Sequence, residues 1–145
     1  MRNIELLTNH GNDALRVSAD YPSRRGMPSH RYVISGFDTS DNGAARSGGF
    51  IPRFQDVSII LQSEGAANDL RPDGVSSDAL LAIVEDHLSG LQGGPDASLN
   101  KQLAIEYISH ARQLLAEEAA AQSSHYSNST RWGGSERRVG GHHSL

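Results

Sequence analysis

Side chains that can recognise a phosphorylated sugar come from three stretches of this 145-residue sequence. Arg53 and Gln55 lie in the segment FIPRFQ, and Arg71 lies just before a helix-like segment. Gly94 and Pro95 belong to a Gly-Gly-Pro turn whose glycine N–H groups are further donors. Arginines and backbone donors are the groups that bind phosphate and ribose in proteins. We therefore predict a binding site for a phosphate-bearing ligand.

Two aromatic residues, Phe54 and Tyr107, offer faces on which a base could stack. Taken singly, each of them fits a core residue as well, and that alternative stays open. No general base accompanies this set of donors and aromatic rings. The set therefore favours binding over turnover.

A basic pair, Arg24 and Arg25, lies in the segment YPSRRGMPSH, which reads as an exposed loop because it holds two prolines and a glycine. The pair has two interpretations. It is either a solvated part of that loop or a second place where a phosphate is held.

Signatures of catalysis are absent from the sequence, which has no GxSxG, no phosphate-binding loop ending in Lys-Ser/Thr and no HExxH. Glu106 and His110 stand four residues apart on a helix-like segment, where Asp86 and His87 of the preceding segment could join them on a metal. Polar residues of a helix surface fall at that spacing by chance. We expect a binding protein without catalytic residues, metal or cofactor, and keep Asp86 and His87 as ligand-binding candidates.

Residues 74–122 must position the hairpin part of this site, because they form two amphipathic helical segments joined by the Gly-Pro turn. Ser76 or Ser77 can cap the first segment, and Asp96 or Ser98 can cap the second. Apolar residues recur at three- and four-residue steps, which places them on one face of each helix. These residues are Leu80, Leu81, Val84, Leu88 and Leu91 in the first segment, and Leu103, Tyr107, Ile108, Ala111, Leu114 and Leu115 in the second. We expect an antiparallel helical hairpin.

Short strand-like segments precede the hairpin. They are residues 3–8, 14–19, 31–37, 50–55 and 57–62. Residues 31–37 are the richest in β-branched and aromatic side chains, so we place them centrally in the sheet. Strands followed by helices predict an α+β fold, with a small antiparallel sheet of about five strands, then a two-helix hairpin. The predicted divisions are a β region 1–73, a hairpin 74–122 that packs on it and mediates oligomerisation, and a flexible, disordered tail 123–145.

The composition narrows the classes of partner. A net charge of −4 argues against binding long nucleic acid through its backbone. No apolar stretch approaches the roughly 18 residues that span a bilayer, so we expect no membrane partner. The absence of cysteine fits a reducing compartment. We expect a soluble cytoplasmic protein.

The segment GVSSDALLAIVEDHLSGLQGGP, followed by an Ala- and Leu-rich helix that begins near Asn100, resembles the helical hairpin of phage anti-defence sponge proteins. These are the Thoeris anti-defence and anti-CBASS sponges. The segments RYVISGF and RFQ are similar to the β-portion of the Thoeris-type members, so the resemblance covers roughly residues 31–122.

The resemblance implies capture of a signalling molecule. Such proteins bind cyclic nucleotide second messengers, among them glycocyclic ADP-ribose and cyclic oligonucleotides, without cleaving them. The defence effector of the infected bacterial host is then never activated. The resemblance also implies a homo-oligomer, a hexamer built from dimers, with pockets between subunits. The protein would act in the cytoplasm of that host.

The sequence departs from this family at specific positions. Ser77 and Asp78 stand where we expect an Asn-Glu pair, and Asp96 and Ala97 stand where Phe and Cys often follow the Gly-Pro turn. His87 stands where an arginine commonly follows the aspartate of the first helix. If that arginine holds a phosphate in relatives, this chain has changed its ligand or uses another cation. A histidine there would make binding depend on pH near neutrality.

Two rival functions remain open. A small oligomeric structural or protein-interaction protein would use the hairpin as its partner-binding surface. A phosphodiesterase-like enzyme would destroy the messenger, but this class normally needs paired metal ligands.

Overall fold

The computed structural model describes residues 1–8, 14–22, 24–45, 55–63 and 72–143, with side chains as far as Ser124 and without that of Gln55. The chain divides into two compact units, Met1–Val75 and Ser76–Leu145. The first unit contains the strands and the second contains the helices. Each unit is described by itself.

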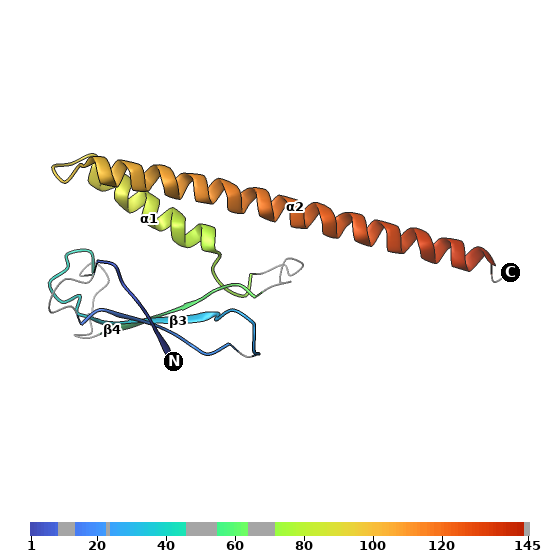
Figure 1. The fold of residues 1–145 in the computed structure, drawn as a ribbon, viewed down its shortest axis with the longest axis horizontal. Coiled ribbons are helices and arrows are strands. Elements are labelled where there is room, and N and C mark those ends of the chain that lie inside the picture. The colour runs from blue at the N-terminus through green and yellow to red at the C-terminus, as the bar shows by residue number, and fades with distance from the viewer. Residues whose placement is uncertain (9–13, 23, 46–54, 64–71, 144–145) are drawn as a thin grey trace. The chain divides into compact units, whose positions relative to one another are not determined.

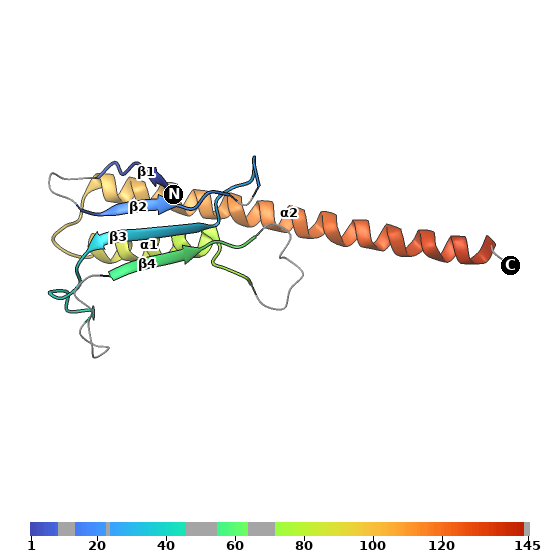
Figure 2. The ribbon, with the colours of Figure 1, turned by 90° about the horizontal axis from the view of Figure 1, so that it is seen from below.

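Four strands form an antiparallel sheet in the first unit (Figure 1). They are β1 (Arg2–Ile4), β2 (Arg16–Ala19), β3 (Arg31–Phe37) and β4 (Gln55–Ile60), and they lie side by side in chain order (Figure 2). β3 has the predicted bounds and lies between β2 and β4, which confirms its interior place. The strand expected at 50–55 lies outside the described residues except for Gln55, which begins β4.

The register gives the sheet one apolar and one polar face. Ile4, Val17, Ile34 and Val57 are cross-strand partners in one row. Ala19, Tyr32 and Ile59 are partners in the next row of the same face, with Arg2 at its β1 end. Ala19 is fully buried. Asn3, Ser18, Val33 and Ser58 form a row on the opposite face. The alternation of side chains along each strand therefore decides which face is apolar.

Gly36 allows β3 to make its irregular pairing with β4. It has a φ of 84°, a backbone conformation that favours glycine, and the register shifts between Ile34 and Phe37. A Cβ built at Gly36 would lie 1.7 Å from the carbonyl oxygen of Ala14. The backbone approach leaves no room for a side chain.

The chain returns to β4 before it enters the second unit. Val75 donates its N–H to the Ile60 carbonyl at 2.8 Å and accepts from Gln62 N–H at 3.0 Å. Asp73 accepts hydrogen bonds from the hydroxyl of Ser63 and, at 3.1 Å, from its backbone N–H. These bonds tie Asp73 to Ser63 and Val75 to the end of the last strand.

The second unit is a pair of packed helices, α1 (Ser77–Gln92) and α2 (Leu99–His143). Of the two predicted cap candidates, Ser76 is the one that caps α1, because it accepts a hydrogen bond from Ala79 N–H at 3.0 Å. Ser98 caps α2 by accepting from Lys101 N–H at 3.2 Å. The predicted fold class is therefore confirmed: a small antiparallel sheet followed by a helical hairpin.

Two details differ from the sequence expectation. β1 ends at Ile4 rather than at Thr8, and Leu7 beyond it is almost fully exposed. The backbone of α2 continues past Gln122 to His143, although Ala119, Ala120 and Ala121 are the last strong helix formers before the Ser- and Gly-rich part. None of the helices within the described ranges is both long and apolar enough to cross a membrane.

Candidate functional site

One arginine fixes which faces of the two helices meet. Arg112 on α2 donates from Nε to Oδ1 of Asp78 at 2.7 Å and from an Nη atom to Oε2 of Glu85 at 3.0 Å. These hydrogen bonds, with that to Asp78 the larger contribution, raise the pKa of Arg112 above its ordinary value. The arginine is charged at any physiological pH. The α1-facing side of α2 is therefore the side that carries Arg112.

The two α1 candidates, Asp86 and His87, lie away from α2. Successive residues of a helix are about 100° apart, so His87 points about 160° away from the direction of Glu85. Both side chains are exposed. Neither makes a hydrogen bond or ion pair with another residue that the structure describes. They are available to a ligand from solvent.

Tyr107 lies on the opposite side of the hairpin. It precedes Arg112 by five residues, which places it about 140° from the α1-facing side of α2. Its side chain is 73% exposed, so it is not the core residue that the alternative interpretation proposed. The structure does not bring Tyr107 together with Asp86 and His87 within one chain.

The Gly-Pro turn offers a ligand fewer free backbone N–H donors than the sequence suggested. Gly93 and Gly94 donate their N–H groups to the carbonyls of Gly90 and Leu91, both at 3.2 Å. Pro95 has no N–H to give. Gly94 and Pro95 are exposed, but the two glycine donors of this turn are already used in closing it.

Arg24 and Arg25 are exposed in a turn of the first unit that a bond from Met27 N–H to the Arg24 carbonyl closes at 3.1 Å. Gly26 supplies the positive φ of 84° that this turn uses. Neither guanidinium pairs with another described residue. Both remain available to a phosphate.

Three of the candidates, Arg53, Phe54 and Arg71, lie outside the described residues. Gln55 begins β4, where its backbone pairs with Phe37. The prediction that these residues bind a ligand stays a prediction.

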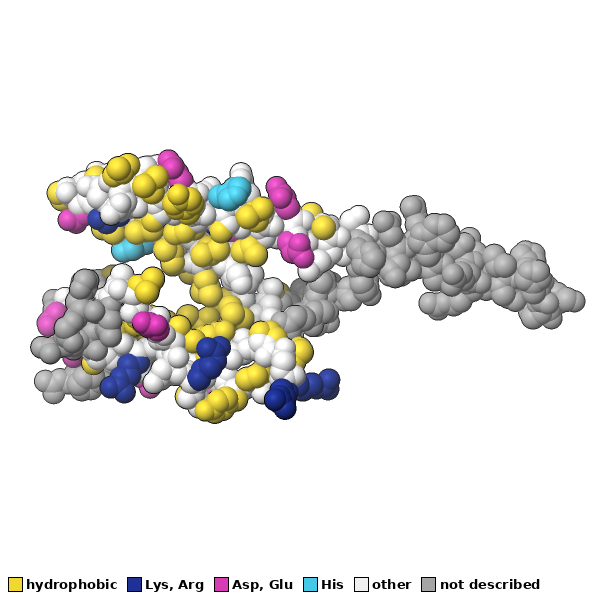
Figure 3. Space-filling view, in the orientation of Figure 1, with side chains coloured by type: hydrophobic (Ala, Val, Ile, Leu, Met, Phe, Trp, Pro, Cys, Tyr) yellow, Lys and Arg dark blue, Asp and Glu magenta, His cyan; other side chains and the backbone are white. Residues whose placement is uncertain are grey.

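The cations are divided unequally between the two units. Figure 3 shows most of the Lys and Arg side chains over the sheet unit, whereas the hairpin displays mainly apolar and acidic side chains. In the described part of the hairpin through Ser124, the cations are Lys101 and Arg112, and Arg112 is engaged by two carboxylates. The described side chains that could bind a phosphate through a positive charge therefore lie mainly in the sheet unit.

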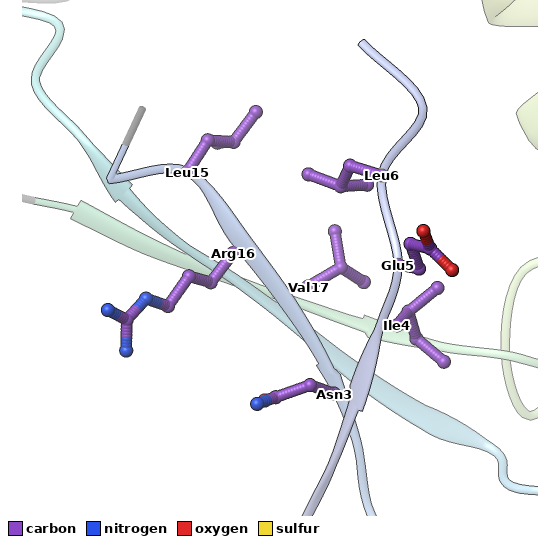
Figure 4. A pocket seen from close by; sticks show the side chains of 7 residues that line it. All are labelled: Asn3, Ile4, Glu5, Leu6, Leu15, Arg16 and Val17. Atoms are coloured by element: carbon purple, nitrogen blue, oxygen red, sulfur yellow. The ribbon is translucent and has the colours of Figure 1, made fainter. Parts of the chain in front are cut away.

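A pocket that sequence reasoning did not predict lies where β1 and β2 diverge beyond their last paired residues (Figure 4). Its volume is about 300 Å³, and it is lined by Asn3, Ile4, Glu5, Leu6, Leu15, Arg16 and Val17. Figure 4 shows Arg16 and Asn3 extending to one side, away from the apolar side chains. None of the predicted site residues lines it. The sequence does contain a signal for it, the apolar residues Ile4 and Leu6 opposite Leu15 and Val17. The same residues also fit two ordinary paired strands, so they did not predict a pocket.

Within the described ranges, no group of three or more His, Asp or Glu residues is placed to hold a metal ion. Glu106 and His110 remain a pair on the surface of α2.

Comparisons with known proteins find no family model and no curated protein that matches this sequence. The resemblance to the sponge proteins therefore remains a prediction that depends on the quoted motifs.

Proposed function

We propose that this protein sequesters a cyclic nucleotide signalling molecule without cleaving it. Glycocyclic ADP-ribose and cyclic oligonucleotides are the ligand classes in question. The capture would prevent activation of a defence effector in the cytoplasm of an infected bacterial host. The protein would act as a homo-oligomer, a hexamer built from dimers.

The observation that carries this proposal is the availability of the candidate side chains. Arg24, Arg25, His87 and Tyr107 are all exposed, and none of them is engaged by another described residue. Guanidinium groups recognise phosphates, and an exposed tyrosine ring offers a face to a base.

The geometry of the hairpin also favours a site shared between subunits. Tyr107 and His87 lie on opposite outer sides of one hairpin, so a single hairpin cannot present both to one small ligand. A second copy can place the Tyr107 side of one hairpin beside other groups. Enclosure between subunits would also exclude water, which nanomolar binding, about 12 kcal/mol, normally requires.

A second candidate function is a scaffold that binds a partner protein through its hairpin. The favourable observation is the set of exposed apolar residues on α2, which includes Leu99, Leu103 and Leu114. The two functions differ in what the arginines do. A sponge loses ligand affinity when they are removed, whereas a scaffold keeps its partner.

A thermal-shift screen tests the proposal. The full chain is heated with cyclic dinucleotides, cyclic trinucleotides and cyclic ADP-ribose isomers, each at a concentration series up to 1 mM. One class is expected to raise the midpoint saturably, by about 5 °C or more once the ligand exceeds its Kd by 100-fold. No shift with any of these ligands would contradict the sponge and leave the scaffold.

A further inference from the structure

The loop between β2 and β3, residues 21–30, combines an exposed aromatic ring with two exposed arginines. Its sequence, YPSRRGMPSH, contains no Asp or Glu, although the whole chain has a net charge of −4. Tyr21 is 71% exposed, and Arg24 and Arg25 are exposed as well. None of these three side chains is hydrogen-bonded to or paired with another residue that the structure describes. The loop therefore offers one ring and two positive charges to a partner from solvent.

The two ends of the loop are held together at the sheet. Asp20 donates its backbone N–H to the Arg31 carbonyl at 2.9 Å, and the Asp20 carboxylate accepts from the Arg31 guanidinium at 3.0 Å. A second nitrogen of Arg31 lies 3.5 Å from the hydroxyl of Ser58 on β4. The carbonyl of His30 accepts from Leu61 N–H at 2.7 Å. The base of the loop is thus closed between β2 and β3 and bonded to β4 and the residue that follows it.

The tip of the loop is closed by a tight turn. Met27 donates its N–H to the Arg24 carbonyl at 3.1 Å, and Gly26 supplies the positive φ of 84° that the turn uses. Pro22 and Pro28 fix φ on either side of this turn. A loop that is restrained at its base and at its tip loses less conformational freedom when it binds a ligand, so more of the contact energy appears as affinity.

A nucleotide requires an aromatic face and a positive charge within the length of one ligand. Tyr21 and Arg25 are four residues apart, a length of chain that spans at most about 14 Å. Arginine pairs with phosphate oxygens through parallel N–H bonds, and a tyrosine ring stacks on a base. The loop meets both requirements with residues of one short segment.

Tyr107, the tyrosine that the sequence put forward, lacks free cations among the described side chains of its own unit. The Lys and Arg side chains described there are Lys101 and Arg112. Lys101 donates from Nζ to the Asp96 carbonyl at 2.6 Å, and Arg112 holds two carboxylates. Tyr107 and Tyr21 are exposed to nearly the same degree, 73% and 71%. The neighbouring charges therefore distinguish the two rings, and they favour Tyr21.

We propose that Tyr21 stacks on the base of a bound nucleotide while Arg24 and Arg25 pair with its phosphates. The inference rests on the proposed function and deepens it, since it names the residue that stacks on the base and assigns this contact to the sheet unit. The ion pair of Asp20 and Arg31 holds the loop that presents these side chains. A tyrosine face accepts every base, so the loop is expected to select for phosphorylated nucleosides and to tolerate exchange of the base.

Nuclear magnetic resonance of the full chain, labelled with ¹⁵N and titrated with ADP up to 10 mM, tests these contacts. ADP carries one base and two phosphates and is not itself a cyclic messenger. The amide signals of Tyr21, Arg24 and Arg25 are expected to shift saturably. Adenosine alone should shift Tyr21 more than the arginines, and inorganic diphosphate should do the reverse. The absence of saturable shifts in the loop at 10 mM ADP would overturn the inference.

Two substitutions at Tyr21 test stacking, and neither removes a contact with another described residue. Tyr21→Leu, which removes the ring, is expected to raise the Kd for ADP at least about fivefold, and Tyr21→Phe, which keeps it, less than about twofold. Leu7→Ala changes a residue of the sheet unit that is 96% exposed outside the loop, and as the matched control it should leave the Kd unchanged. An unchanged Kd in Tyr21→Leu, or equal weakening by both Tyr21 variants, would overturn the assignment of the base to Tyr21.

Failure of this inference is distinguishable from failure of the sponge. If the wild-type protein captures a messenger, and Tyr107→Leu but not Tyr21→Leu weakens that capture, the sponge stands and the assignment to the loop is wrong. If ADP binds at the loop but no messenger class raises the thermal midpoint, the loop contacts stand and sequestration fails.

Discussion

The Nε atom of Arg112 lies 2.7 Å from Oδ1 of Asp78, across the hairpin from the side on which Tyr107 is exposed. The same guanidinium reaches Glu85, which follows Asp78 by seven residues, or about two helical turns. A planar fork that holds two carboxylates on one side of α1 sets the rotation of both helices. The outward directions of His87 on α1 and of Tyr107 on α2 follow from this contact.

Replacing Arg112 should therefore loosen the hairpin. We expect Arg112→Met to lower the thermal midpoint by a few degrees, since the variant keeps much of the aliphatic stem but leaves Asp78 and Glu85 without their cation. Circular dichroism at 222 nm measures the change. Arg24→Met removes an exposed arginine without such partners and should leave the midpoint unchanged. Equal effects of the two substitutions would show that the ion pairs do not orient the helices.

Acid should release Ser63 from Asp73. The hydrogen bond from the Ser63 hydroxyl, aided by the Ser63 N–H, holds the pKa of Asp73 below its usual value of 3.8. In the interval between the two pKa values the native state binds fewer protons than the unfolded state, so stability rises with pH there. The contribution is present above about pH 4 and is lost as pH falls through the lower, native pKa. Amide hydrogen exchange at Ser63 should show faster opening in Asp73→Asn than in wild type at pH 6. The difference between the two proteins should shrink as pH falls and the wild-type carboxylate is protonated, and equal exchange in the two proteins at pH 6 would argue against the bond.

Gly36 should be intolerant of any side chain. Its positive φ alone costs a non-glycine residue on the order of 1–3 kcal/mol, and the Ala14 carbonyl occupies the place of a Cβ. Gly36→Ala should therefore destabilise the sheet by more than Gly26→Ala, where φ is also 84° but no atom lies within 4 Å of the new Cβ. Urea denaturation, followed by near-ultraviolet absorption of the tyrosines, measures both. If the two variants lose the same stability, the close approach of Ala14 is not what selects glycine.

The elements were predictable where local chemistry decides them. Ser76 and Ser98 are each one of the two cap candidates that the sequence offers for their helix, and both are caps in the structure. Residues 31–37 form a strand with the predicted bounds. Those outcomes depend on short-range hydrogen bonds and on side-chain type.

The faces of α2 were not predictable in the same way. Six apolar residues of the second segment look like one broad face in sequence, but Ile108 and Ala111 are half-buried whereas Tyr107 and Leu114 are exposed. The ion pairs of Arg112 determine which of these residues face α1. Arg112 and Asp78 are 34 residues apart in the sequence, so the apolar periodicity of α2 alone does not reveal their contact. The pocket between β1 and β2 was not predicted either. It forms where the pairing of the two strands stops after Ile4, and the sequence does not mark where that pairing ends.

The arginine pair should contribute to ligand affinity. In the proposed sponge, replacing Arg24 and Arg25 together by glutamine removes charge-assisted hydrogen bonds to phosphate, and we expect the Kd to rise about 10- to 100-fold. Isothermal titration calorimetry with the ligand found by thermal shift measures it. Arg2→Gln, which removes an exposed arginine from β1, is the control and should bind normally. An unchanged Kd in the double variant would assign the pair to a solvated loop.

Equilibrium dialysis followed by recovery tests sequestration most directly. The protein is dialysed against the messenger class that stabilises it, and free messenger is measured before and after the protein is denatured by heat. We predict that free messenger falls in proportion to the protein added and returns in full, chemically intact, on denaturation. Recovery of a cleaved product would make the protein an enzyme, and no depletion at micromolar protein would contradict sequestration.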